Sequence, residues 1–159
     1  MQLPAKQISI AGVVAAAYFV ITITPGINAI SYGLVQFRIA EALTVLPFVF
    51  PGAIAGVFVG CLLANIFGPV GLQDIIFGSS ITFIAAWLTH ALRRTGKPAL
   101  APIPPIVLNA FGVSAYLHIL FGEPYWLFVL SIGLGQTVVC YLLGYPLLKY
   151  IIKRRRDFN

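Results

Sequence analysis

Charged residues are scarce in this sequence, and acidic residues are the scarcest of them. Of the 159 residues, 9% are charged and four are Asp or Glu. Soluble domains carry roughly 25% charged residues, and a chain this short has too little interior to hide a 60% hydrophobic composition from water. The composition therefore excludes a soluble domain. No stretch is polar enough for a linker or a soluble module, so we treat residues 1–159 as a single transmembrane domain.

The motifs of catalysis and cofactor binding are also missing. The sequence contains no Walker motif and no Gly-rich phosphate loop, so the chain is not expected to hydrolyse ATP itself. No nucleophile has a base at a usable spacing, and neither His90 nor His118 has a ligand-spaced partner for a metal. Cys61 and Cys140 stand alone in apolar segments, where free cysteines are typically buried. We predict no enzyme, no cofactor and no resident metal.

Long apolar runs fill most of the chain instead. A bilayer core needs ~20 apolar residues per helix. Pro25-Gly26 ends the first run, because proline lacks an amide proton and the pair favours a turn. Four full-length spans are expected, over residues 8–24, 74–92, 102–120 and 126–152.

The segment from Glu41 to Gly68 is harder to assign, because it is too short for two full-length spans and long for one. Pro47 and Pro51 interrupt it, and Pro51-Gly52 favours a tight turn. We predict a hairpin of two short helices here, which gives six spans in total. A single kinked span, which gives five, is the alternative.

Basic residues gather in two clusters that flank apolar spans. The positive-inside rule predicts both on the cytoplasmic face, and six spans place Lys6 there too, whereas five would place it outside. Because the basic residues flank apolar spans, we expect them to contact anionic membrane lipid rather than nucleic acid. With six spans, Glu41, Asp74 and Glu123 fall at the outer boundary. The clusters are Arg93, Arg94 and Lys97, and Lys149, Lys153, Arg154, Arg155 and Arg156.

Small residues predict close helix contacts. Ala11 and Ala15 share one face of the first span, which indicates either packing inside the bundle or docking of another membrane subunit. In the third span a strip of small residues recurs every four positions, and we predict that it packs inside the bundle. The strip is Gly52, Gly56, Gly60 and Ala64.

Polar residues within the spans are the candidate binding residues, because in hydrocarbon they tend to face a bundle interior or a cavity. Acids, a base, amides and aromatics near one end of a bundle are typical of a solute pocket, and they suit a planar nitrogen heterocycle. The polar candidates are Gln36, Arg38, Glu41, Asn65, Asp74, Asn109 and Gln136, and the stacking candidates are Tyr32, Phe37 and Trp126.

Each candidate also has a purely structural interpretation. Arg38 and Glu41 are one helical turn apart and are able to pair at the interface. Asp74 opens a helix, where a carboxylate interacts favourably with the helix dipole. Asn109 and Gln136 lie deep enough to bond to each other. Aromatic residues near a span end are typical of a membrane-interface belt.

Three segments resemble the QueT family of membrane proteins, and the likeness covers nearly the whole chain. Its members are substrate-binding S components of energy-coupling factor (ECF) transporters associated with queuosine precursors. The segments are VQFRIAEALTVLP (Val35 to Pro47), GCLLANIFGPVGLQDIIFGSSIT (Gly60 to Thr82) and PPIVLNA (Pro104 to Ala110).

The resemblance implies an all-α polytopic membrane protein, a six-helix transmembrane bundle with both termini in the cytoplasm of a bacterial cell. It implies a queuosine precursor, such as a 7-deazaguanine base, as substrate, with Glu41 and Asp74 as first candidates for its N–H edge. Residues 25–38 would form a lid. The implied partners are an ECF coupling membrane subunit, docked on Ala11 and Ala15, and two cytoplasmic ATPase subunits. An S component for another vitamin-like heterocycle and a structural membrane subunit remain alternatives.

Overall fold

The computed structural model describes residues 5–27, 31 and 37–157, and this part of the chain is built from helices. Its α-helices are α1 (Ala5–Ile23), α3 (Gly52–Ile66), α4 (Ser79–Leu92), α5 (Ile103–Leu108), α6 (Ser114–Phe121), α7 (Tyr125–Val138) and α8 (Tyr145–Asp157). The 3₁₀ helices are η1 (Ile39–Phe48), η3 (Arg93–Thr95) and η4 (Pro98–Leu100). The π-helical segments are η2 (Asp74–Gly78), η5 (Asn109–Val113) and η6 (Val139–Gly144).

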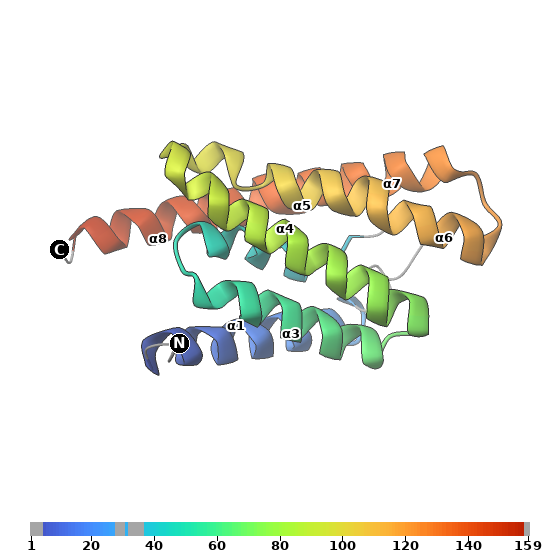
Figure 1. Ribbon diagram of the computed structural model, residues 1–159, viewed down its shortest axis with the longest axis horizontal. Helices are drawn as coiled ribbons and strands as arrows, with labels where there is room; N and C mark the ends of the chain where they lie inside the picture. Colours follow the sequence, from blue (N-terminus) through green and yellow to red (C-terminus); the bar gives the residue numbers. More distant parts are fainter. Residues whose placement is uncertain (1–4, 28–30, 32–36, 158–159) are drawn as a thin grey trace.

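These elements join into six rods that form one bundle (Figure 1). Within the described residues, four rods are long and apolar enough to cross a bilayer: Ala5–Ile23, Asp74–Thr95, Pro98–Phe121 and Tyr125–Arg155. Two shorter apolar helices, η1 and α3, make up the hairpin. The prediction of an all-α polytopic membrane protein with six helices is therefore confirmed.

The hairpin turns where the sequence predicted it, between η1 and α3. Ten residues of 3₁₀ helix rise about 20 Å, so η1 covers more of the bundle than an α-helix of the same length would. Pro51 ends the turn, and α3 begins at Gly52. The Gly52 amide donates a hydrogen bond to Oε1 of Gln7 at 2.7 Å, which satisfies one of the unpaired amides at the start of α3.

The small-residue strip of α3 packs against α1, as predicted. A Cβ atom on Gly60 would lie 2.7 Å from the Cβ of Tyr18, and one on Gly56 would lie 2.8 Å from the Cβ of Val14. Larger residues would force the two helices apart. Close backbone approach of this kind is how helices associate in lipid.

Ala11 and Ala15 lie on the α1 side of this contact. Ala15 is buried, and the carbonyl oxygens of Ala11 and Ala15 lie 2.9 and 2.8 Å from Cβ positions built on Gly56 and Gly60. The structure thus shows internal packing for this face. A docking role for the pair stays a prediction, whereas their neighbours Gly12 and Ala16 are exposed.

The start of α1 and the end of α8 lie at the same end of the bundle, as an even number of crossings requires (Figure 1). At this end Arg93, Arg94 and Arg155 line one hollow, and Lys6, Arg154 and Arg155 line another. We call it the basic end. The loop between α6 and α7, which contains Glu123, lies at the opposite end (Figure 1).

Candidate functional site

Two carboxylates lie buried in the interior of the bundle. Glu41 is 1% exposed and Asp74 is 3% exposed, so both are enclosed by neighbouring helices. Glu41 belongs to the first turn of η1, whose residues are almost all buried, and Asp74 begins η2. At this depth a carboxylate must be paired or hydrogen-bonded.

Asp74 is held by groups from three other parts of the chain. Its Oδ2 atom lies 3.4 Å from Nη2 of Arg38, which is also buried. Its Oδ1 atom accepts a hydrogen bond from the hydroxyl of Tyr116 in α6. Its backbone carbonyl accepts one from Nδ2 of Asn65 in α3 at 2.8 Å. Three rods and the segment before η1 therefore converge on this residue.

Glu41 is held in the same manner by other rods. The hydroxyl of Tyr18 in α1 donates to Oε1, and Nδ2 of Asn109 in η5 donates to Oε2 at 3.2 Å. The thiol of Cys140 lies 3.6 Å from the Glu41 backbone carbonyl and 3.5 Å from Oε1 of Gln136. Glu41 thus connects α1, η5 and the last rod.

Cys61 lies among the residues that surround Asp74. Its sulfur is 3.8 Å from Nη1 of Arg38, 3.5 Å from Nδ2 of Asn65 and 3.4 Å from Oγ1 of Thr82. The side chains around Asp74 and those around Glu41 are joined through the backbone, because the Glu41 amide donates to the Arg38 carbonyl at 2.9 Å. We call the two sets together the polar cluster. Its members are Tyr18, Arg38, Glu41, Cys61, Asn65, Asp74, Ser79, Thr82, Asn109, Tyr116, Gln136 and Cys140.

Asn65 has unused hydrogen-bonding capacity within this network. Its amide nitrogen also lies 3.3 Å from Oγ of Ser79. Its Oδ1 atom is buried and has no hydrogen-bond partner among the residues that the structure describes. A buried acceptor without a partner costs about 1–3 kcal/mol, so a bound solute that donates to this oxygen would gain that energy.

Departures from α-helical geometry occur beside the polar cluster in three rods. Asp74 begins η2, Asn109 begins η5, and Cys140 lies within η6. π-helical turns are rare and occur often at functional sites, because they redirect side chains from the regular helical register. Here they turn polar groups of three rods toward a shared interior.

The absence of a side chain at Gly78 leaves room for the side chains of Asp74 and Tyr116. A Cβ atom at this position would lie 2.6 Å from Oδ1 of Asp74 and 3.1 Å from the hydroxyl oxygen of Tyr116. Any side chain would therefore collide with the carboxylate or displace it. The glycine at the end of η2 permits the contact between Asp74 and Tyr116.

The structure brings most of the predicted polar residues together. Arg38, Glu41, Asn65, Asp74, Asn109 and Gln136 all belong to the polar cluster. Within it, Asn109 bonds to Glu41 and Arg38 pairs with Asp74. Gln36, Tyr32 and most of the predicted lid lie outside the described residues.

The stacking candidates are placed differently. Trp126 is 66% exposed on the outer surface of α7 and packs edge-on against Tyr125, with ring centroids 5.3 Å apart. The structure does not bring it to the polar cluster, because Phe128, Ile132 and the other buried residues of α7 lie on another face of the helix. Phe37 is partly exposed and directly precedes Arg38.

The sequence interpretation missed the two phenols and gave Cys61 no role beyond burial. The spacing of all three in the sequence points to their positions, because residues one or two helical turns apart lie on the same face of a helix. Tyr18 follows Ala15 by one turn, and Tyr116 follows Asn109 by two. Cys61 precedes Asn65 by one turn of α3.

The polar cluster consists of hydrogen-bond donors and acceptors around two acids, a chemistry suited to binding a polar solute. Among the described residues, no group of three His, Cys, Asp or Glu side chains is arranged to hold a metal ion. The model of the QueT transporter family matches residues 8–153. The chain belongs to the QueT transporter family. The match includes every member of the polar cluster and confirms the resemblance seen in the sequence.

One curated relative shares part of its sequence with the chain. The queuosine precursor transporter QueT of Lactococcus lactis subsp. cremoris (strain MG1363) is 38% identical over 74 residues, which cover 46% of this chain and 44% of that protein. The similarity thus spans less than half of the relative's length. No solved structure matches the chain. Family membership and the four apolar rods together indicate a membrane protein with a role in transport.

Proposed function

We propose that this chain is the substrate-binding subunit, or S component, of an ECF-type importer and that its substrate is a queuosine precursor with a 7-deazaguanine base. The observation that carries the proposal is the polar cluster, in which two buried carboxylates lie in the interior of a QueT family bundle. Buried ionisable residues inside membrane spans commonly mark a substrate site. The printed function of the Lactococcus relative supports the substrate class.

The chemistry of the cluster fits a solute that is rich in N–H donors. Glu41 and Asp74 bring two carboxylates, and Arg38 is the guanidinium beside them among the described residues. A guanine-like edge offers a ring N–H and an amino group side by side, which one carboxylate accepts as a pair. The open Oδ1 of Asn65 provides a further acceptor.

Binding would exchange one set of donors for another. In the structure described here, the hydroxyls of Tyr18 and Tyr116 donate to the carboxylates. A solute that donates in their place keeps each acid satisfied, and the phenol rings are then released to pack against the heterocycle. The site therefore needs no metal and no covalent chemistry to hold its substrate.

Energy for transport would come from partner subunits, because the chain has no nucleotide-binding motif. An ECF coupling membrane subunit and two cytoplasmic ATPase subunits would supply it, and the chain itself would not act as an enzyme. The positive-inside rule places the basic end, and with it both termini, in the cytoplasm of a bacterial cell. The polar cluster would then receive its substrate from the outer side.

Two alternatives make different predictions. An S component for another vitamin-like heterocycle would use the same cluster for a different ring edge. A structural membrane subunit would keep the cluster as an internal network, which the many hydrogen bonds within it also permit. The discriminating property is ligand-dependent stability.

A thermal-shift screen of the purified chain against 7-deazapurines and B vitamins tests the proposal. A ligand that binds only the folded state at one hundred times its Kd adds about 2.7 kcal/mol of stability. We expect the 7-deazaguanines to raise the unfolding temperature and the adenine-like 7-deazapurines to leave it unchanged. A rise with a B vitamin alone supports the first alternative. No rise with any ligand, for protein that unfolds cooperatively, supports a structural subunit.

A further inference from the structure

An apolar groove crosses the surface near the basic end, between the first turns of α1 and the middle of α8. It encloses about 350 Å³. Lys6 lies at one end of the groove and Val13 lies two helical turns further along α1, which corresponds to roughly 10 Å. Its walls include Ile10, Val13 and Val14 of α1, Leu46 and Phe50 of the hairpin, and Ile151 of α8.

A basic hollow continues this groove toward the end of the bundle. It encloses about 640 Å³ and shares Lys6, Ile10, Phe50 and Ile151 with the groove, while Tyr150, Arg154 and Arg155 complete it. Its two arginines are held by aromatic rings. The Arg154 guanidinium lies 5.6 Å from the centre of the Tyr150 ring, and that of Arg155 lies 5.7 Å from the centre of the Phe50 ring.

The cations of this hollow are not matched by nearby acids among the described side chains. Glu41 and Asp74 are buried in the polar cluster, and Glu123 lies in the loop at the opposite end (Figure 1). Arg154 uses its Nε atom to donate to the Tyr150 hydroxyl at 3.1 Å. Its terminal nitrogens and the Lys6 ammonium line the same hollow and are donors of the kind that bind phosphate groups.

We infer that the groove and the hollow together form a site for one anionic glycerophospholipid. Its phosphate binds to Lys6, Arg154 and Arg155, and one acyl chain lies along Ile10 and Val13. The surface suits both parts of such a ligand, because the cations complement its phosphate and the adjoining groove accommodates an apolar chain. Basic pockets between membrane helices recognise anionic headgroups in this way.

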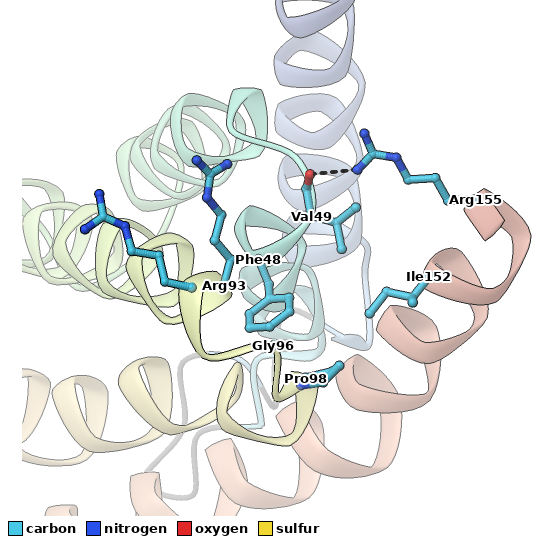
Figure 2. A pocket seen from close by; sticks show the side chains of 8 residues that line it. Phe48, Val49, Arg93, Gly96, Pro98, Ile152 and Arg155 are labelled. Atoms are coloured by element: carbon cyan, nitrogen blue, oxygen red, sulfur yellow. Dashed lines mark hydrogen bonds between the residues drawn. The ribbon is translucent and has the colours of Figure 1, made fainter. Parts of the chain in front are cut away.

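A second basic hollow, seen in Figure 2, provides an internal comparison. It encloses about 560 Å³ and is lined by Arg93, Arg94 and Arg155, with Phe48 as part of its apolar wall. Nη1 of Arg155 donates to the carbonyl of Val49 at 3.3 Å, shown dashed in Figure 2. The described lining of this hollow shares no residue with the apolar groove, so it offers charge without a place for the chain.

The test compares two double variants that remove the same charge. Purified protein in detergent receives equal amounts of phosphatidylglycerol and phosphatidylcholine with identical acyl chains, and native mass spectrometry measures the retained lipid. K6Q/R154Q changes the proposed site, and R93Q/R94Q changes the comparison hollow. Arg155 is left in place because it borders both. Each removed charge near a lipid surface is worth roughly a fivefold change in binding.

We expect wild-type protein and R93Q/R94Q to prefer phosphatidylglycerol and K6Q/R154Q to lose at least about tenfold of that preference. Equal losses in both variants would show a general charge effect and overturn the site. A loss confined to R93Q/R94Q would overturn it in favour of the comparison hollow. No preference in the wild type would overturn it as well.

The acyl chain has a separate test. Val13 is 70% exposed in the groove, and Val20, which is 55% exposed, lies two turns further along α1 outside it. We expect V13W to reduce phosphatidylglycerol retention several-fold and V20W to leave it unchanged. Equal retention in both variants would overturn the groove.

Inorganic phosphate, added at the same phosphate concentration as the lipid, should not displace the lipid. If it does, the site binds free phosphate and the lipid assignment is wrong.

Discussion

The hydroxyl of Tyr116 donates a hydrogen bond to Oδ1 of Asp74, which lies 42 positions earlier in the chain. Tyr18 donates in the same way to Oε1 of Glu41. Each buried carboxylate therefore receives a phenol from another rod of the bundle. Because a tyrosine hydroxyl is neutral and able to rotate, a solute is able to take its place. The ion pair between Arg38 and Asp74 keeps the Asp74 charge compensated both with and without the solute.

Substitution of the two acids should separate their roles. We expect Glu41→Gln and Asp74→Asn each to weaken binding of a 7-deazaguanine, one of them much more than the other. The amide keeps one acceptor and turns the other position into a donor that opposes a donor of the substrate. Such a loss costs about 1–3 kcal/mol, or roughly tenfold to a hundredfold in Kd. Calorimetry on each purified variant measures it.

Glu123→Gln is the matched control for these variants, because Glu123 is exposed in the loop between α6 and α7. Its affinity should equal that of the wild type. If both buried-acid variants also bind as tightly as the wild type, the pocket lies elsewhere, and Asn65, Asn109 and Gln136 become the next residues to change.

Removal of the phenol hydroxyls should affect the ligand-free protein most. Tyr116→Phe takes a donor from Asp74, and Tyr18→Phe takes one from Glu41, at a cost of about 1–3 kcal/mol each. We expect a lower unfolding temperature without ligand and a larger rise on ligand addition than in the wild type, since the solute supplies the missing donor. Equal rises in wild type and variants would contradict donor exchange.

Tyr141→Phe is the control for the phenol variants. The Tyr141 hydroxyl donates to the carbonyl of Ala99 at 3.2 Å near the surface. Loss of this bond should change stability little and should leave the effect of the ligand at the wild-type value.

The contact between α1 and α3 should be sensitive to size at one glycine and insensitive at another. Gly60→Val places a side chain where Tyr18 Cβ lies 2.7 Å away, whereas Gly12→Val meets nothing within 4 Å. Both changes replace a helical glycine with the same residue, so propensity effects cancel in the comparison. We expect Gly60→Val to lower thermal stability, because the added side chain forces α1 and α3 apart. Equal stability of the two variants would contradict the packing.

Topology is open to a labelling test. Lys6→Cys and Lys97→Cys should react with a membrane-impermeant maleimide from the same side, because six spans return both positions to one face. The native cysteines, Cys61 and Cys140, are fully buried and are expected to remain unlabelled. Reaction of the two introduced cysteines from opposite sides would indicate an odd number of crossings.

Much of the fold follows from local sequence features. The turn at Pro51-Gly52 and the strip from Gly52 to Ala64 act over a few residues, and both appear in the structure as predicted. Local sequence features do not predict the 3₁₀ geometry of η1 or the three π-helical segments, because these depend on how neighbouring rods pack. No local propensity separates a π-helical turn from an α-helical one.

The candidate site shows the same division. A polar residue in an apolar span is conspicuous because its burial in lipid is costly. On this ground the sequence predicts Glu41, Asp74 and Asn109 as binding residues. Tyr116 is near a span end, where an aromatic residue is typical of an interface belt, and Tyr18 lies in the middle of an apolar run with no polar neighbour to mark it. Trp126 is a stacking candidate in the sequence because an aromatic residue near a span end suits either a pocket or an interface belt. Its position on the outer face of α7 depends on the register of the helix.

The most direct test of the account is a calorimetric titration of the purified, folded chain with a 7-deazaguanine in the absence of ATP, metal and partner subunits. We predict saturable heat at a stoichiometry of one, with the affinity lowered at least about tenfold in either Asp74→Asn or Glu41→Gln and unchanged in Glu123→Gln. No heat with any queuosine precursor, for protein shown to be folded by a cooperative unfolding transition, would contradict the account.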